Sequence, residues 1–190
     1  MNVKKYISLI QDFRPNNTTQ EKLDKIISSI NKLGGKKNLN MVFICTHNSR
    51  RSQFSEIWGN VLSAYHKKNI KVFSAGIIKT EVFSQVVKSF KRIGFKIIKN
   101  KNSYLFQHLN ININLYSKIL SDIKINDFIS ITTCSEADAS CPIDLRSKLN
   151  LKLLYKDPKI YDNTKNEQKK YDSTCLKIAS ELNYIFKNIN

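Results

Sequence analysis

The first stretch whose residues suggest chemistry is Cys45 to Ser52, which reads Cys-Thr-His-Asn-Ser-Arg-Arg-Ser. Five residues separate Cys45 from Arg51, enough for backbone N–H groups to surround a tetrahedral anion, and a helix N-terminus after the loop would add partial positive charge. Arg51 can hold two anion oxygens at once. The spacing predicts an oxyanion-binding loop made of Thr46, His47, Asn48, Ser49 and Arg50.

Cys45 is the candidate nucleophile of this loop. The positive charge that binds an anion also favours the thiolate form of a cysteine, and the thiolate is the reactive form. The Ser52 hydroxyl could donate a hydrogen bond to that thiolate, and Asn48 could stabilise the loop from within. These residues predict attack of sulfur on a bound oxyanion, followed by hydrolysis or by reduction.

Asp157, followed by Pro158, is the candidate general acid. Hydrolysis of a phosphate ester needs an acid to protonate the leaving oxygen. Asp157 comes directly after the apolar run that ends at Tyr155, where a loop could reach over the anion. Asp162 is the second choice, although the turn before the last helix also explains it.

Cys134 and Cys141 form the second chemical feature. Cys134 ends a β-branched run, and Cys141 follows seven residues later. If the strand before Cys134 lies beside the strand before Cys45, both sulfurs leave the same sheet edge. Neighbouring strands are about 4.8 Å apart and a disulfide needs α-carbons about 4.4 to 6.8 Å apart. Two buried structural thiols are the competing interpretation, and Cys175 is expected in the core.

These residues need a scaffold of strands and helices. Short apolar runs predict strands at 41–44, 72–75, 95–98, 128–133 and 151–155. Apolar residues at helical spacing predict helices at 52–65, 81–93 and 166–189. The alternation predicts an α/β fold, with a mostly parallel sheet covered by helices on both faces. Residues 100–126 stay open between a hairpin and an irregular insertion.

Residues 1–39 are predicted to form an N-terminal helical extension of a main domain at 40–190. The pattern Thr18-Thr19-Gln20-Glu21 predicts a capping box, and Gly34-Gly35 predicts the end of that helix. A second capping box is predicted at 164–167. The apolar stripe of the extension is expected to pack on the main domain, with a partner surface as the alternative.

The composition indicates a globular protein. The chain has 190 residues, 41% hydrophobic and 25% charged, and no apolar run of membrane-spanning length. Its formal charge of +17 attracts anions, but the lysines are scattered and no nucleic-acid recognition motif is present, so no nucleic acid is expected. No signal-peptide core develops, which predicts a cytoplasmic location. The absence of a Cys-x-x-Cys pair argues against a zinc site.

The Cys45 loop, the Asp157-Pro158 pair and the segment from Cys134 to Cys141 together resemble the low-molecular-weight protein tyrosine phosphatase family, and specifically its thioredoxin-coupled arsenate reductase branch. The resemblance covers about residues 40–188 and implies that family's fold. It implies these roles: Cys45 as the nucleophile, Arg51 as the oxyanion clamp, Ser52 as the thiolate stabiliser, Asp157 as the acid, and Asn48 with Glu56 at a potassium ion, with no other cofactor.

The resemblance also implies a thiol relay. Cys45 would attack arsenate, Cys134 would attack Cys45 and release arsenite, and Cys141 would attack Cys134. A thioredoxin-type partner could then reduce the exposed Cys134–Cys141 disulfide. We therefore expect an arsenate reductase. A phosphatase that forms a phosphoenzyme on Cys45 is the first alternative, and an oxyanion-binding or redox-sensing protein is the second.

Two loop residues depart from the family pattern. His47 stands where the family usually has glycine, so a positive φ is expected there, at some cost for histidine. His47 could also contact the substrate, or simply face outward. Arg50 stands where the reductases commonly carry a further cysteine.

Overall fold

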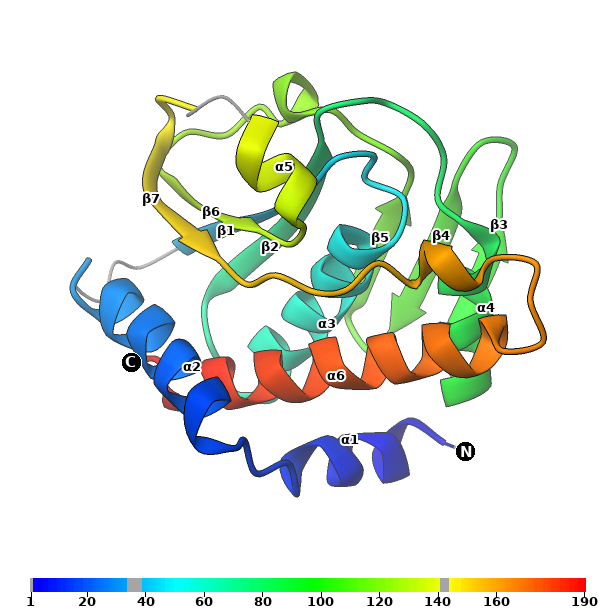
Figure 1. Cartoon of the computed structure of the whole chain (residues 1–190), viewed down its shortest axis with the longest axis horizontal. Coiled ribbons are helices and arrows are strands. Elements are labelled where there is room, and N and C mark those ends of the chain that lie inside the picture. The colour runs from blue at the N-terminus through cyan, green and yellow to red at the C-terminus, as the bar shows by residue number, and fades with distance from the viewer. Residues whose placement is uncertain (1, 34–38, 141–143) are drawn as a thin grey trace.

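A four-stranded parallel sheet forms the centre of the molecule (Figure 1). The computed structural model describes residues 2–33, 39–140 and 144–190. The strand order is β2-β1-β6-β7, and every neighbouring pair is parallel. The bounds are Leu39–Cys45 for β1, Ile70–Gly76 for β2, Phe128–Thr132 for β6 and Ser147–Lys152 for β7. The predicted α/β class with a mostly parallel sheet is confirmed.

The two faces of the sheet are covered differently. Met41 and Phe43 point into the large core shared with α3 (Arg51–Tyr65), α4 (Ser84–Ile93) and α6 (Glu167–Asn188). Val42 and Ile44 alternate to the opposite face, because successive strand side chains point to opposite sides. That face packs against the segment containing the 3-10 helix η1 (Leu120–Asp122). The short helix α5 (Ser135–Ser140) contacts β1 and β6.

Residues 100–126, which the sequence left open, contain a hairpin. β4 (Tyr104–His108) and β5 (Ile111–Leu115) pair antiparallel, and β3 (Lys96–Lys99) completes a second, three-stranded sheet. Leu109, in the tight turn, adopts a positive φ of 50°. After the hairpin, residues 116–118 run without regular structure toward η1. This segment contacts the Cys45 loop through bonds from Ser117 to the His47 carbonyl and from the Lys118 N–H to Asn48 Oδ1.

Several predicted boundaries and caps need correction. α4 begins at Ser84 rather than residue 81, because Phe83 has an extended backbone and serves as its N-cap. β7 ends at Lys152, so only the start of the strand predicted at 151–155 belongs to it. The cap of the second helix is Asn16, whose side chain accepts from the Thr19 N–H, rather than the predicted Thr18 box. At the last helix, Asn166 is the N-cap and makes no side-chain capping bond.

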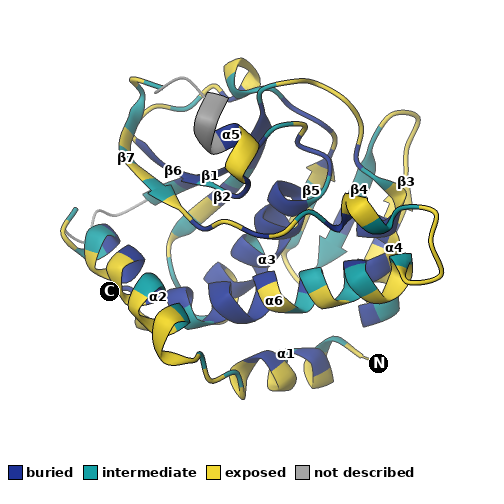
Figure 2. Cartoon of the chain, viewed as in Figure 1, coloured by how far each residue is buried: buried dark blue, intermediate teal, exposed yellow. Residues whose placement is uncertain are grey.

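The N-terminal helices α1 (Val3–Gln11) and α2 (Asn17–Asn31) pack on α6 and share the main core. Figure 2 shows their buried stripes facing inward and their exposed faces outward. The Tyr6 ring stacks on Trp58 of α3 with ring centroids 5.3 Å apart. The predicted domain boundary near residue 39 stays a prediction, and the predicted stop at Gly34-Gly35 lies outside the described residues. None of the described helices has the length and apolar character that a membrane span requires.

Candidate functional site

The loop from Cys45 to Arg50 connects the carboxyl end of β1 to the first residue of α3. Asn48 and Ser49 are buried, whereas His47 is exposed. The positive φ of this loop occurs at Asn48, with a value of 46°, and not at His47. The expectation of strain at His47 is therefore wrong by one position, and asparagine tolerates this conformation better than most residues.

Cys45 is buried and faces the start of α3. Its Sγ lies 3.0 Å from Ser52 Oγ. Asn48 Nδ2 donates to the same Ser52 oxygen at 2.9 Å, so the Ser52 hydroxyl hydrogen is free to point at the sulfur. A hydroxyl group and the N-terminus of α3 thus both lie at the Cys45 sulfur.

Arg51 is held from the side opposite the loop. Its Nη1 donates to the Tyr155 carbonyl at 3.0 Å, and its Nη2 donates to the Asp157 carboxylate. The Arg51 Nε is buried and has no hydrogen-bond partner among the described residues. A buried N–H of this kind normally has an acceptor, and an oxyanion in the loop would supply one.

The two candidate acids have different surroundings. Asp157 lies against Arg51 and caps the 3-10 helix η2 (Pro158–Tyr161) by accepting from the Lys159 N–H at 3.0 Å. Asp162, the second choice, instead accepts from Arg50 and from Tyr171, each at 2.6 Å. Of these two candidates, Asp157 is thus the one beside Arg51, whose Nη2 also lies 3.7 Å from a carboxylate oxygen of Glu136.

Arg50 points away from the loop interior. Its Nε donates to the Tyr171 hydroxyl at 2.5 Å, and its guanidinium lies 4.1 Å from the centre of the Phe83 ring. Burial alone would lower the pKa of Arg50, but the bonds to Tyr171 and Asp162 outweigh it and raise that pKa. The Arg50 backbone belongs to the oxyanion loop, while its side chain ties that loop to α6.

Cys134 lies next to the loop, because the strand before it is the neighbour of β1. β6 pairs with β1, and the Thr133 N–H donates to the Ile44 carbonyl at 2.8 Å. Cys45 and Cys134 belong to one small buried cluster together with Ala137. The Thr46 hydroxyl and Cys134 Sγ are 3.4 Å apart. Cys141 lies outside the described residues.

The third buried cysteine belongs to the core. Cys175 is fully buried, and Trp58 Nε1 donates to its sulfur at 3.2 Å. Burial raises the pKa of its thiol to about 12. The expected core role of Cys175 is confirmed.

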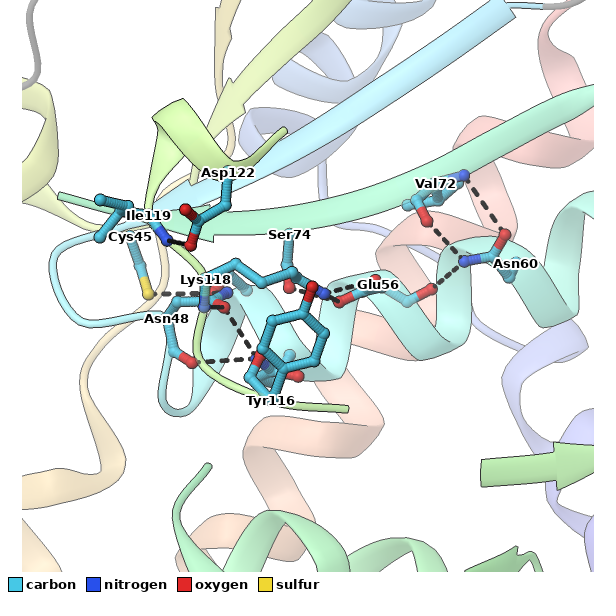
Figure 3. Close-up of polar contacts among 12 residues, drawn as sticks. Cys45, Asn48, Glu56, Asn60, Val72, Ser74, Tyr116, Lys118, Ile119 and Asp122 are labelled. Atoms are coloured by element: carbon cyan, nitrogen blue, oxygen red, sulfur yellow. Dashed lines mark hydrogen bonds and ion pairs between the residues drawn. The ribbon is translucent and has the colours of Figure 1, made fainter. Parts of the chain in front are cut away.

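Lys118 is a functional candidate that the sequence did not reveal. Figure 3 shows its side chain reaching Glu56, whose two carboxylate oxygens accept from Lys118 Nζ at 3.0 and 2.9 Å. The two residues are 62 positions apart. The sequence contains many lysines, and no pattern of residues around Lys118 indicates a contact with Glu56.

The residues expected to bind potassium do not fit that ion. The ammonium of Lys118 pairs with the Glu56 carboxylate at the position that a cation would take. The Ser74 hydroxyl also donates a hydrogen bond to the Glu56 carboxylate. Asn48 Oδ1 already accepts from Gln53 Nε2 and from the Lys118 N–H. The oxygen atoms needed as ligands are therefore occupied by N–H and O–H donors.

Known proteins resemble this chain in part of its sequence and in its fold. No family model matches the chain. Arsenate reductase 1 of Staphylococcus epidermidis is 38% identical over 101 residues, which cover 53% of this chain and 64% of that protein. The match thus spans somewhat less than two thirds of that relative.

Solved structures share the fold. A structure described as an arsenate reductase in the phosphate binding state matches with a TM-score of 0.55 and 16% identity, over 80% of this chain and 99% of that one. A low-molecular-weight phosphotyrosine phosphatase from Vibrio cholerae matches with a TM-score of 0.53 and 20% identity, over 76% and 92% of the two chains. The chain therefore has the low-molecular-weight phosphatase fold and distant sequence similarity to arsenate reductases.

Proposed function

We propose that this chain, which has the low-molecular-weight phosphatase fold, is an arsenate reductase that uses Cys45, Cys134 and Cys141. The observation that carries the proposal is the buried contact cluster containing both Cys45 and Cys134. Hydrolysis needs only one of these thiols, whereas reduction needs a second sulfur close to the first. The sequence similarity to arsenate reductases supports the same choice.

The first step is binding and attack. Backbone N–H groups of the loop and Arg51 hold the arsenate oxygens. The Cys45 thiolate attacks arsenic, a sulfur–arsenic bond forms, and one arsenate oxygen leaves as water after protonation. Asp157, beside Arg51, can supply a proton for that oxygen.

The second step transfers the electrons. The Cys134 thiolate attacks Cys45 sulfur and forms a disulfide. The electron pair of the broken sulfur–arsenic bond passes to arsenic, which is reduced from As(V) to As(III) and leaves as arsenite. Cys141 then attacks Cys134, releases Cys45 as a thiolate, and leaves a Cys134–Cys141 disulfide for a thioredoxin-type dithiol to reduce.

Phosphate-ester hydrolysis is the second candidate, and the position of Asp157 favours it. An acid against the anion-binding Arg51 is what a leaving alcohol requires. The two activities share the attack by Cys45 and differ in whether water or Cys134 attacks the intermediate. A single substitution can therefore separate them.

The test is disulfide mapping after one turnover. Reduced protein is incubated with arsenate, quenched with N-ethylmaleimide, and digested for mass spectrometry. We expect one arsenite per chain and a Cys134–Cys141 disulfide in the wild type. In the Cys141→Ser variant, the relay stops one step earlier, so a Cys45–Cys134 disulfide is expected to accumulate.

Matched variants decide between the two candidates. Cys134→Ser is expected to form no arsenite while retaining p-nitrophenyl phosphate hydrolysis, and Cys45→Ser is expected to lose both activities. Cys175→Ser, a substitution in the core, is the control that retains the relay. Arsenite production by Cys134→Ser at the wild-type rate would rule out the relay and leave hydrolysis as the better assignment.

A further inference from the structure

A buried ion pair lies behind the Cys45 loop, between α3 and the irregular segment 116–118. The side chains of Glu56 and Lys118 are only 4% and 7% exposed. The Tyr116 ring covers the ammonium, with its centroid 5.0 Å from Nζ. Because an unpaired charge is costly to bury, each member of the pair depends on the other.

Lys118 also contacts the loop through its backbone (Figure 3). Its N–H donates to Asn48 Oδ1 at 2.8 Å, and its carbonyl accepts from the Gly76 N–H at 2.7 Å. Asn48 Nδ2 in turn donates to Ser52 Oγ, which lies 3.0 Å from Cys45 Sγ. A continuous series of hydrogen bonds therefore joins Lys118 to the reactive sulfur.

The neighbours of Lys118 brace the same region. The Ser117 hydroxyl donates to the His47 carbonyl at 3.0 Å, and the Tyr116 carbonyl accepts from Gln53 Nε2 at 3.0 Å. Three consecutive residues thus bind the loop or the first turn of α3. Since residues 116–118 form no helix or strand, these contacts and the Glu56 pair fix where the segment lies.

A cavity beside the ion pair determines what could replace the Lys118 ammonium in a variant with a shorter side chain at this position. A cavity of about 390 Å³ borders both Glu56 and Lys118. Removing the Lys118 side chain would leave a buried carboxylate next to this space. Ammonium and potassium ions are similar in size and could enter it, whereas choline is too large to take the place of Nζ.

We propose that Lys118 is a positioning residue that supplies, from within the chain, the cation that holds Glu56, Asn48 and the Cys45 loop in their anion-binding arrangement. The reactivity of Cys45 then requires no added monovalent cation. This deepens the proposed function, because the loop is the one in which Cys45 attacks. The role of Lys118 can be tested separately from the reduction of arsenate, because Lys118 acts on the Cys45 loop before any arsenate binds.

The test compares the wild type with Lys118→Ala in choline, potassium and ammonium chloride at equal ionic strength. In choline chloride, we expect the variant to melt about 10 °C lower, because it contains an unpaired buried carboxylate. We also expect iodoacetamide to label its Cys45 about tenfold more slowly at pH 7, since the hydrogen bonds that join residue 118 to the Cys45 loop are disturbed. Ammonium and potassium should restore most of the lost melting temperature and labelling rate of the variant. The wild type should show the same melting temperature and labelling rate in all three salts.

Two further variants complete the design. Lys118→Met removes the charge but still fills the space, so its losses should persist in ammonium chloride. Lys71→Ala removes an exposed lysine from the border of the same cavity and should match the wild type. If Lys118→Ala does not fold in choline chloride, refolding in ammonium chloride replaces labelling as the measurement.

Three results would overturn the proposal: a wild type whose Cys45 labelling needs potassium, a Lys118→Ala variant that is unaffected in choline chloride, or losses that ammonium does not restore. None of these measurements uses arsenate. If no thiol relay is found but ammonium restores Lys118→Ala as expected, only the proposed function is refuted. If the relay is found but ammonium does not restore Lys118→Ala, only the role of Lys118 is refuted.

Discussion

Among the residues that the structure describes, three cysteines are buried, and each has different surroundings. Cys45 lies against the Ser52 hydroxyl and the N-terminus of α3. Cys134 accepts from the Ala137 N–H at 3.4 Å and lies in the same cluster as Cys45. Cys175 is enclosed by the core, where burial raises its pKa to about 12. Burial alone therefore does not decide which sulfur reacts.

Selective alkylation tests this difference. At pH 8, about four units below the pKa of Cys175, roughly one Cys175 side chain in ten thousand is a thiolate. We expect iodoacetamide to modify Cys45 in the native protein and to leave Cys175 unmodified, as measured by peptide mass mapping. The same protein unfolded in urea is the control and should be labelled at both. Equal native labelling of the two cysteines would contradict this assignment.

At the level of elements, Arg50 couples the anion loop to the start of α6. Its guanidinium binds Asp162 and Tyr171 and covers the Phe83 ring. The Tyr171 hydroxyl also donates to Asp162, and burial raises the pKa of Tyr171, which keeps that hydroxyl protonated. Asp157 precedes Asp162 by five residues in the chain. We call the mutual contacts of Arg50, Asp162 and Tyr171 the latch.

A double-mutant cycle can measure this latch. We expect Arg50→Gln and Asp162→Asn to be coupled by about 1 to 3 kcal/mol in the free energy of unfolding, because the two residues share one mostly buried network. Urea unfolding of the two single variants and the double variant gives the coupling energy.

The exposed pair Lys148–Asp127, with a similar distance of 2.8 Å, is the matched control. Its expected coupling is about 0 to 1 kcal/mol, since solvent screens exposed charges. A coupling of Arg50 with Asp162 no larger than that of the control pair would show that the latch contributes nothing beyond a surface contact.

At the level of the whole molecule, the N-terminal helices are part of the main core. Leu23 and Ile10 are fully buried, and Asn183 Nδ2 on α6 donates to the Ile10 carbonyl. Tyr6 stacks on Trp58, which lies in α3, the helix that begins with Arg51. The described residues of the extension thus pack against α3 and α6.

Truncation of a buried leucine tests how much this packing stabilises the protein. We expect Leu23→Ala to lower the free energy of unfolding by about 2 to 5 kcal/mol, because it leaves a cavity in the shared core. Leu9→Ala, at a side chain 47% exposed on α1, is the control and should change it by less than about 0.5 kcal/mol. Similar effects in both variants would show that the extension is not integrated with the core.

The sequence alone determined the features that depend on neighbouring residues. The β1 strand, the Cys45 loop and α3 follow one another within 27 residues, so apolar periodicity and the Cys-x5-Arg-Ser spacing were enough to predict them. The adjacency of β1 and β6 was only a condition of the sequence argument, and the strand pairing in the structure decides it. Boundaries were less certain, as the starts of α4 and β7 show, because caps depend on backbone conformation at single residues.

Only the tertiary structure decided how distant segments complete the site. Lys118 meets Glu56 across 62 positions, and Arg50 meets Asp162 across 112. Neither contact leaves a periodic or local pattern, because the hairpin and the order of the strands decide which side chains meet. The sequence could therefore predict the Cys45 loop. The contact of Lys118 with Glu56 and the contact of Arg50 with Asp162 depend on the tertiary fold, which brings distant segments together.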